Sequence, residues 1–340
     1  MHPGSTASLP RSPARVRASW RNSASPGRRR EGDDDMTATQ TLGWIGLGKM
    51  GLPISTRIAA AGRDIAGYDR DQERIASAAG GGVTPAATLA DAAGRDIVFT
   101  SLPDDRALRA AALDGPLLSA MRQGAILVET STVSPGISAQ VAEAARQRGI
   151  AYLRAPVSGN AAIAHTGNLT CFVSGPRAAF DAVLPVAQDF TRAQKYLGTQ
   201  EEARYAKLAV NLMIAVSAAM MGESIVLARK GNLRWADILD VLRDSAVGSP
   251  MVHYKAASLS TRDFISTFSC RQMAKDLDLI VDAGHATEMA MPLATLTREI
   301  YGALIGRGEG EADFISTVRL AEWLAGLGEP DLDKNEGRLA

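Results

Sequence analysis

The chain has 340 residues and a formal charge of zero; 46% of its residues are hydrophobic and only 5% aromatic. This length predicts two domains that each bury a core, and the neutral charge gives no support for a nucleic-acid or anionic-membrane partner. The two cysteines, Cys171 and Cys270, have neither zinc-site nor disulfide-framework spacing, so we expect no metal and a reducing, cytoplasmic compartment.

Residues 1–35 differ in composition from the rest of the chain. They are rich in Ser, Pro and Arg, and they end in three aspartates just before Met36. Few of them could enter a core, so we expect disorder. An Arg- and Ser-rich start is also typical of transit peptides, but we expect instead that the working protein begins near Met36. Residues 1–38 are therefore treated as a leader outside the fold.

A glycine-rich loop lies between a predicted strand at residues 41–45 and a predicted helix at residues 54–61. In such a loop Gly46 permits a tight turn, Gly48 lets the backbone approach a pyrophosphate, and Gly51 lets helix and strand pack closely. The helix N-terminus then offers free N–H groups to the anion. The loop reads Gly46, Leu47, Gly48, Lys49, Met50, Gly51.

Asp69 ends a second predicted strand, residues 64–69, at about the distance expected for an acid that binds the cofactor ribose. The loop and this acid together predict a dinucleotide site, with an ordinary structural turn as the alternative.

Further strands are predicted at residues 96–102, 124–129, 151–153 and 170–174, and helical patterns alternate with them. This alternation predicts a parallel, doubly wound sheet, and so an α/β Rossmann domain over residues 39–198. Such sheets bind ligands at the carboxyl ends of their strands. Those ends carry Gly46, Asp69, Leu102, Pro103, Ser131 and Thr132.

After residue 198 the pattern is helical, with no convincing strand. A long helix at residues 201–230, interrupted only weakly by Gly222, predicts an interdomain helix followed by an all-α domain over residues 199–328 and a tail at 329–340. We expect no bilayer-spanning segment, because the apolar run 208–221 is short and contains Asn211. Further helices are predicted at 234–245, 269–283, 292–305 and 315–325.

Lys207 and Asn211 are four residues apart on the long helix and so lie on one face, among apolar neighbours. A buried lysine and amide are unfavourable unless something polar meets them. Lys207 could exchange a proton with a substrate hydroxyl that Asn211 orients. The alternative, which spacing alone favours, is a snorkelling lysine with a satisfied helix asparagine.

Two other segments are ambiguous when taken alone. Successive N–H groups around Ser158, Gly159 and Asn160 could form a nest for a carboxylate, but an ordinary Pro/Gly turn is the favoured alternative. Lys275 and Asp276 open the polar side of a predicted helix, and by themselves they indicate only a solvated charge pair.

In this order the segments resemble the β-hydroxyacid dehydrogenase family, which includes 3-hydroxyisobutyrate and tartronate semialdehyde dehydrogenases and relatives of 6-phosphogluconate dehydrogenase. The resemblance spans residues 41–325, and the ordered set is far more specific than any single motif. The matching segments are residues 46–53, 102–103, 131–135, 155–159 with 167–170, Lys207 with Asn211, 275–277 and 308–313.

The resemblance implies that Lys207 is the catalytic acid/base, which reverses the interpretation from spacing. It implies that Ser158, Gly159 and Asn211 hold the substrate, beside Asn160 of the same loop. It also implies a homodimer or homotetramer. The residues implied or predicted to bind the cofactor are Gly46, Leu47, Gly48, Lys49, Met50, Gly51, Asp69, Arg70, Leu102, Pro103, Thr132 near the ribose and Lys275 at the nicotinamide end.

The chain also departs from the family pattern. The family usually has an acid at 154, glycines at 160, 201 and 203, and asparagine at 210, where this chain has Arg, Asn, Glu, Ala and Val. We expect these departures to surround the substrate pocket and to change the substrate rather than the reaction. Arg154 or His165 could meet a second anionic group, although a surface salt bridge or loop packing is the favoured role of each.

Asp69 favours NAD, because a carboxylate accepts hydrogen bonds from the ribose hydroxyls and repels a 2′-phosphate. Arg70 could instead pair with that phosphate, so NADP stays open. We therefore expect an NAD(P)-dependent oxidoreductase that interconverts a small β-hydroxyacid and its semialdehyde or ketoacid. The alternatives are an imine reductase, which generally lacks the lysine, and a non-catalytic dinucleotide-binding scaffold.

Overall fold

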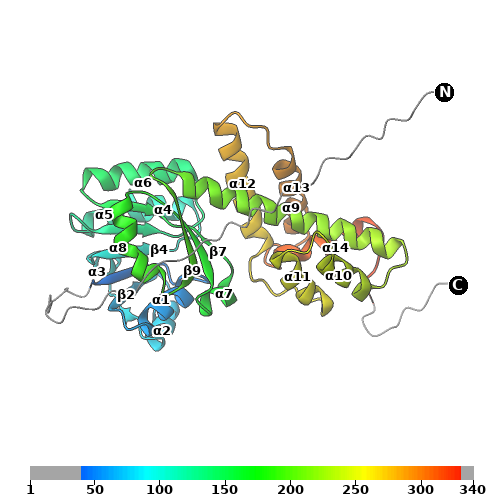
Figure 1. The fold of residues 1–340 in the computed structure, drawn as a ribbon, viewed down its shortest axis with the longest axis horizontal. Coiled ribbons are helices and arrows are strands. Elements are labelled where there is room, and N and C mark those ends of the chain that lie inside the picture. Colours follow the sequence, from blue (N-terminus) through cyan, green and yellow to red (C-terminus); the bar gives the residue numbers. More distant parts are fainter. Residues whose placement is uncertain (1–39, 331–340) are drawn as a thin grey trace, which may run out of the picture. The chain divides into compact units, whose positions relative to one another are not determined.

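The computed structural model describes residues 40–330, whose N-terminal part is built on one nine-stranded sheet (Figure 1). Six parallel strands follow the order β3-β2-β1-β4-β5-β6, so the winding reverses between β1 and β4. This order is that of a dinucleotide-binding domain, and it confirms the predicted Rossmann fold. The six strands are β1 (Leu42–Ile45), β2 (Ile65–Tyr68), β3 (Thr84–Pro85), β4 (Ile97–Thr100), β5 (Ile126–Glu129) and β6 (Ala151–Arg154).

The predicted parallel sheet is confirmed for these six strands, but the edge beyond β6 departs from it. There β8 (Leu169–Ser174) runs antiparallel to β6 and to the short β7 (Val157–Ser158), while β9 (Thr191–Gly198) runs parallel to β8. The connection from β7 to β8 holds only the five-residue α7 (Ala161–His165), which is too short for a crossover to a parallel neighbour. Strands β3 and β7 are two residues long and β9 is largely polar, so none gives a clear apolar run.

Alternate residues of the strands feed two hydrophobic clusters, one on each face of the sheet. Trp44 and Phe99 stack at 5.1 Å between ring centroids on one face, while Ile45 and Val98 point to the other. The first face is covered by α1 (Gly51–Ala60), α2 (Gln72–Gly80) and α8 (Arg177–Ala187). The second is covered by α3 (Leu89–Ala93), α4 (Asp105–Ala112), α5 (Leu117–Ala120) and α6 (Pro135–Gln147).

From residue 199 to 330 the structure is helical, as predicted, apart from one isolated bridge between Ser269 and Asp313. The buried side chains of these helices form a third hydrophobic cluster. The unpredicted α11 begins with Ser249 as N-cap and Pro250 as first residue, a recognisable start signal. The helices are α9 (Glu202–Lys230), α10 (Trp235–Asp244), α11 (Pro250–Ser260), α12 (Cys270–Ala286), α13 (Pro292–Gly306), the 3₁₀ turn η1 (Phe314–Ser316) and α14 (Thr317–Leu324).

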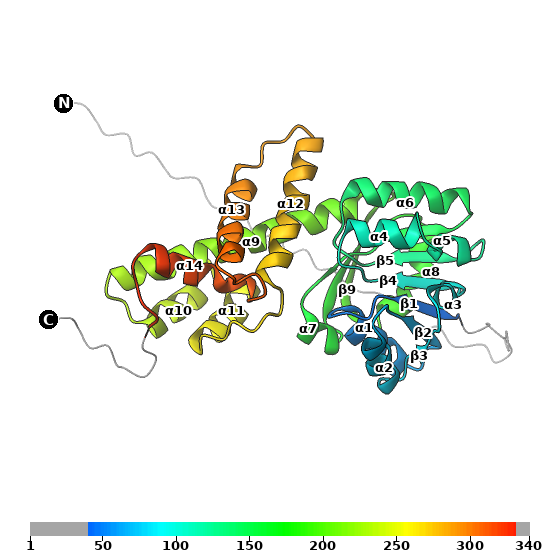
Figure 2. The ribbon, with the colours of Figure 1, turned by 180° about the vertical axis from the view of Figure 1, so that it is seen from behind.

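Helix α9 is 29 residues long, which corresponds to roughly 44 Å, and it leads from the sheet into the helical part (Figure 2). It contacts β8 and β9 and also packs against α10, α12, α13 and α14. Gly222 does not interrupt it. A Cβ there would lie 2.9 Å from the Thr317 carbonyl oxygen, so this glycine allows α14 to pack closely.

The expectation that no segment is apolar enough to cross a bilayer is wrong for α9 by length and composition. Its most apolar 18-residue stretch has a mean hydropathy of 1.7, and it is the one such helix among residues 40–330. However, 39% of that stretch is buried in the structure, and the helix buries Arg204, Lys207 and Asn211. We therefore interpret α9 as a core helix. The predicted leader and residues 331–340 of the tail lie outside the described residues.

Candidate active site

The glycine loop has the geometry that the fingerprint predicts. Gly46 has φ +95°, and a Cβ there would lie 2.2 Å from the Ser101 carbonyl oxygen. At Gly48 an added Cβ would meet only Arg74, 3.6 Å away, so the space beside this glycine is open. Helix α1 starts at Gly51 with no side-chain cap and no acid in its first turn. These features fit a pyrophosphate at the helix N-terminus.

Asp69 lies beside this loop at the end of β2. Its Oδ2 accepts a hydrogen bond from the Leu47 N–H at 2.7 Å, and its Oδ1 accepts one from the Asp71 N–H at 3.0 Å. Arg74 Nη1 lies 3.6 Å from Asp69 Oδ2, whereas Arg70 is exposed. The acid is therefore placed where the ribose of a cofactor on the glycine loop would reach, with two arginines nearby.

A cavity of about 940 Å³ lies between the carboxyl ends of the strands and helices α9, α11 and α12. This volume is at the upper end of the usual range for ligand sites, so it has room for a small substrate beside part of a cofactor. Eleven predicted site residues line it: Lys49, Met50, Leu102, Pro103, Thr132, Ser158, Gly159, Asn160, Lys207, Asn211 and Lys275. The other six predicted residues lie outside its lining: Gly46, Leu47, Gly48, Gly51, Asp69 and Arg70.

Lys207 is buried, with 9% of its surface exposed, and it lines the cavity. Within residues 40–330 it forms no hydrogen bond or ion pair. Burial lowers its pKa to about 8; Asp276 opposes this shift and Lys275 adds to it. A lysine in this state changes its protonation near neutral pH, as a proton-transfer group must.

The sequence indicates that Asp276 is half of a solvated charge pair, and this prediction is wrong. The carboxylate is 1% exposed, and its Oδ2 accepts a hydrogen bond from Asn211 Nδ2 at 2.5 Å. Its Oδ1 lies 2.7 Å from Lys275 Nζ. Asp276 also lines the cavity, so the sequence analysis missed a site residue. Its position next to Lys275 was the available signal.

Lys275 joins α12 to the end of β5, because its Nζ donates a hydrogen bond to the Thr132 carbonyl oxygen at 2.9 Å. The two residues were predicted separately as cofactor contacts, and the structure places them against each other. Both line the same cavity as Lys207.

The loop from Ser158 to Asn160 forms one wall of the cavity. Gly159 has φ +133°, a conformation that favours glycine. The Asn160 side chain caps α7, since its Oδ1 accepts a hydrogen bond from the Ile163 N–H at 3.0 Å. The asparagine therefore has a local structural role in addition to its place at the cavity.

Arg154 and Glu201, two of the departures from the family pattern, bind each other. Arg154 Nε donates to Glu201 Oε1 at 2.9 Å, and the side chains are only 6% and 15% exposed. The ion pair is therefore buried, not on the surface as expected for Arg154. Of the five departures only Asn160 lines the cavity, and His165 is exposed outside it, so the expectation that the departures surround the pocket is wrong for the other four.

Arg192 is a second residue of the cavity that the sequence analysis missed. It is the extra residue of a bulge in β9, because Leu169 pairs with Thr191 and Thr170 pairs with Ala193. A bulge turns one side chain away from its regular direction. Arg192 lines the cavity and has no hydrogen bond or ion pair within the described part of the chain. A lone arginine in a polar strand gave no signal.

Comparisons with known proteins agree with this geometry. Residues 41–198 match the NAD-binding domain of 6-phosphogluconate dehydrogenase, and residues 202–321 match the NAD-binding domain of NADP-dependent 3-hydroxyisobutyrate dehydrogenase. The chain is 30% identical to the NAD-dependent L-serine dehydrogenase of Pseudomonas aeruginosa over 82% of its own length and 97% of that protein. It is 28% identical to 2-(hydroxymethyl)glutarate dehydrogenase of Eubacterium barkeri, over 84% and 96%.

Solved structures show the same relationship. The 3-hydroxyisobutyrate dehydrogenase of Mycobacterium tuberculosis with L-serine has a TM-score of 0.76 at 28% identity, over 83% of this chain and 99% of that one. An imine reductase from Pseudomonas sp. has a TM-score of 0.56 at 18% identity over the same shares, which shows a shared fold alone. This chain belongs to the β-hydroxyacid dehydrogenase family and is an NAD(P)-dependent oxidoreductase.

Proposed function

We propose that this enzyme oxidises the hydroxyl group of a small β-hydroxyacid, and reduces the corresponding semialdehyde or ketoacid, with Lys207 as the acid/base. The observation that carries the proposal is the unpaired, buried Lys207 at the cavity, with its pKa lowered to about 8. A buried lysine that serves only stability needs a partner, because an uncompensated buried charge is unfavourable.

The glycine loop would hold NAD(P), which would supply the hydride acceptor when the substrate is oxidised and the hydride donor when the semialdehyde or ketoacid is reduced. In oxidation, neutral Lys207 accepts the hydroxyl proton as the C–H bond breaks and the C=O bond forms, and it becomes an ammonium group. In reduction, protonated Lys207 donates its proton to the oxygen of the carbonyl. Proton and hydride thus leave or reach adjacent atoms of one substrate.

The groups around Lys207 support this role. Asp276 fixes the Asn211 amide through its Nδ2, which leaves the amide oxygen and the second N–H for the substrate. The same carboxylate favours the charged form of Lys207, while Lys275 disfavours it. Burial is the main cause that lowers the pKa of Lys207 to about 8, with the two opposed charges as smaller contributions, so both protonation states are accessible near neutral pH.

We assign the substrate carboxylate to the wall formed by Ser158, Gly159 and Asn160. The unpaired Arg192 lines the same cavity, so a second anionic group on the substrate would find a cation there. The relative from Eubacterium barkeri is named for a glutarate, a compound with two carboxylates, which agrees with this assignment.

For the cofactor we favour NAD over NADP, because Asp69 lies at the end of β2. Its Oδ2 already accepts a hydrogen bond from Leu47, which holds the carboxylate at this position. A 2′-phosphate there would meet its negative charge, although Arg70 and Arg74 offer compensating cations. Titration of the two cofactors against intrinsic fluorescence tests this, and tighter binding of NADP would reverse the preference.

We also propose a homodimer or homotetramer. Met213, Met220 and Leu227 are seven residues apart on α9 and are 70%, 56% and 75% exposed. At this spacing they form one apolar stripe along the helix, a surface that a second copy would bury. Sedimentation analysis checks this, and a monomer at micromolar concentration would contradict it.

The two cysteines bear on the compartment. Cys171 and Cys270 are free and buried, and burial raises the pKa of each thiol to about 12, which makes both unreactive. They are compatible with the cytoplasmic location that we propose, which imaging of a fluorescent fusion would test.

The main experiment is a substrate screen that follows reduced-cofactor fluorescence with NAD and NADP. The panel contains 3-hydroxyisobutyrate, L-serine, 2-(hydroxymethyl)glutarate, 4-hydroxybutyrate, threonate, tartronate semialdehyde and sulfonated analogues. On the best substrate, Lys207→Ala should lower kcat by about two to four orders of magnitude and leave cofactor binding intact. Lys230→Ala is the matched control, because Lys230 is exposed at the far end of the same helix.

The alternatives predict different results. An imine reductase would turn over cyclic imines but none of the hydroxyacids. A scaffold protein would bind cofactor without turning over any member of the panel. Nearly unchanged turnover of Lys207→Ala would refute the role of the lysine even if the substrate class is right.

A further inference from the structure

Four charged side chains meet where α9 begins, behind the cavity. Glu129 and Arg154 are direct neighbours on β5 and β6 at the carboxyl ends of these strands. Each binds the first turn of α9: Glu129 Oε2 accepts a hydrogen bond from Arg204 Nη2, and Arg154 donates to Glu201. Two ion pairs therefore connect the start of α9 to the end of the sheet. In one the helix supplies the cation, and in the other it supplies the anion.

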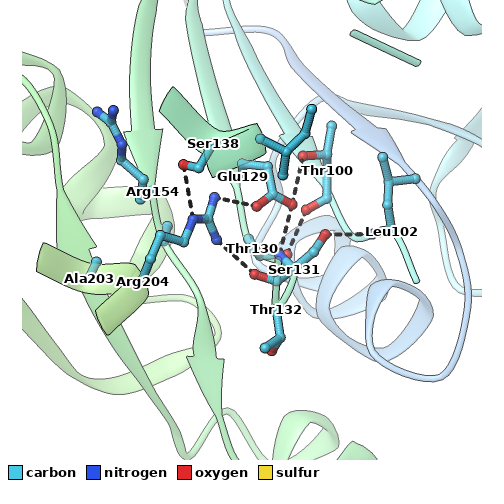
Figure 3. Close-up of polar contacts among 12 residues, drawn as sticks. Thr100, Leu102, Glu129, Thr130, Ser131, Thr132, Ser138, Arg154, Ala203 and Arg204 are labelled. Carbon is cyan, nitrogen blue, oxygen red and sulfur yellow. Dashed lines mark hydrogen bonds and ion pairs between the residues drawn. The ribbon is translucent and has the colours of Figure 1, made fainter. Parts of the chain in front are cut away.

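Arg204 is the centre of this cluster, and its guanidinium uses all three nitrogens (Figure 3). Nε donates to Ser138 Oγ at 3.2 Å, and Nη1 donates to the Ser131 carbonyl oxygen at 2.8 Å. Nη2 donates to Glu129 and also to the Tyr152 hydroxyl, at 3.1 Å. Arg204 is 1% exposed and Glu129 is fully buried, so solvent competes with none of these bonds.

The cluster continues into the strand end that lines the cavity. Glu129 Oε1 accepts a hydrogen bond from the Ser131 N–H at 2.8 Å, and Ser131 Oγ accepts one from the Leu102 N–H at 2.7 Å (Figure 3). Leu102, Ser131 and the adjacent Thr132 all line the cavity, and Lys275 holds the Thr132 carbonyl from the other side. Arg204 is therefore bonded directly to the backbone of the cofactor-side wall.

Lys207 follows Arg204 by three residues, which places it about one helical turn further along α9. The Arg204 guanidinium therefore connects two parts of the cavity wall. One is the turn of α9 that carries Lys207, and the other is the segment Ser131–Thr132 after β5. Hydrophobic residues of similar volume stabilise a fold as well as a buried ion pair does, or better. What they cannot supply is a set of directional bonds that holds two segments in one relative position.

We propose that Arg204 is a positioning residue that fixes Lys207 relative to Ser131–Thr132, the segment that follows β5, with Glu129 as its counter-ion. This inference rests on the proposed role of Lys207. It predicts that loss of the Arg204 guanidinium and its hydrogen bonds lowers kcat by about tenfold to hundredfold, since small misplacements of reacting groups have effects of this size. KM for the substrate should change little, and the pH at half-maximal kcat should not move.

Arg204→Met alone would leave the buried Glu129 carboxylate without its counter-ion, although it keeps the hydrogen bond from the Ser131 N–H, and would strongly destabilise the protein. The decisive variant is therefore Arg204→Met with Glu129→Gln, which removes both charges and keeps similar volumes. We expect a melting temperature close to that of the wild type together with the reduced kcat. A wild-type kcat in this folded double variant would overturn the proposal.

Arg204→Lys is the second variant, in case the double variant does not fold. It keeps a positive charge opposite Glu129 but cannot bind Ser131, Ser138 and Tyr152 at once, so kcat should again fall; full activity would overturn the proposal. Arg229→Met is the matched control. Arg229 is a largely buried arginine near the far end of α9, and its partner Glu322 keeps a second ion pair with Arg262. It should retain wild-type kcat.

A readout without turnover separates this inference from the proposed function. If no substrate in the panel is turned over, hydrogen exchange still reports the position of the two segments. The amides of Leu102 and Ser131 should exchange about tenfold faster in the double variant than in the wild type or in Arg229→Met. Unchanged exchange at these amides would overturn the inference on its own.

Discussion

Two buried lysines of the helical part have opposite surroundings. Lys255 on α11 is 1% exposed, and its Nζ lies 2.6 Å from Asp313 Oδ1. Asp313 Oδ1 also accepts a hydrogen bond from the Ile315 N–H, and Asp313 Oδ2 accepts one from the Thr267 hydroxyl. Lys207 on α9 is nearly as buried but has no such partner within residues 40–330. Burial lowers the pKa of both groups. Lys255, which is part of the core, is therefore paired with an acid, whereas Lys207, which faces the cavity, is not.

This contrast suggests how to separate structural from functional charges in the molecule. Arg204 and Arg154 belong with Lys255, because each is buried against an acid. Lys207 stands apart from all three. The three predictions below test whether its isolation, rather than its burial alone, is what distinguishes it.

The largest difference should appear in stability. Lys255→Met leaves Asp313 buried without its cation and should lower the free energy of unfolding by about 3–5 kcal/mol. Lys207→Met removes a charge that has no ion-pair partner within residues 40–330, so it should leave stability unchanged or raise it. Urea denaturation of both variants measures this. Lys255→Met combined with Asp313→Asn should recover most of the loss, and equal losses in the two single variants would break the comparison.

A slightly smaller effect should appear in the pH dependence of stability. The pKa of Lys207 in the folded protein, about 8, lies below the ordinary value of 10.5, so between these pH values the unfolded chain binds more protons. Stability should therefore rise with pH over this window, by about 3 kcal/mol in total, and the whole penalty is present below pH 8. The measurement is the free energy of unfolding of the wild type minus that of Lys207→Met at each pH. This difference cancels the contributions of Lys255 and the other titrating groups. A difference that falls with pH would contradict the assignment.

The smallest effects should be shifts of the pH–rate profile for oxidation. Its rate should rise with pH as Lys207 loses its proton. Asp276→Asn removes the anion that raises the pKa of Lys207, so the profile should move to lower pH. Lys275→Met removes the cation that lowers it, so the profile should move to higher pH. Shifts in the same direction would show that the two charges do not act on this lysine as described.

The parts of the site that could be predicted are those carried by short segments. The glycine loop depends on spacings of a few residues. For Ser158 with Gly159 and for Lys207 with Asn211, the short segments were informative only as members of the ordered set that resembles the family. Asp276 was misjudged because its burial depends on how α12 packs against α9. Arg192 was missed because it faces the cavity only through a bulge set by pairing with β8.

The fold shows the same division. Five of the six parallel strands and most helices follow from apolar periodicity and turn residues, whereas β3 has only two residues and gives no such signal. The antiparallel edge was mispredicted because β7 has two residues and its partners are set by long-range pairing. β8 runs antiparallel to β7 because the connection through α7 is short. The local sequence pattern of the two strands does not encode this direction.

The sequence was sufficient to predict the alternation of strands and helices and the cofactor loop, because both arise from local backbone preference and apolar periodicity. The other residues around the cavity could be named only through the ordered resemblance to the family. Which buried charges are neutralised depends on the tertiary structure. Arg154 and Glu201 are 47 residues apart, and Glu129 and Arg204 are 75 apart. An ion pair acts over a few ångströms in space regardless of separation along the chain, so the isolation of Lys207 becomes visible only when every other buried charge has found its partner.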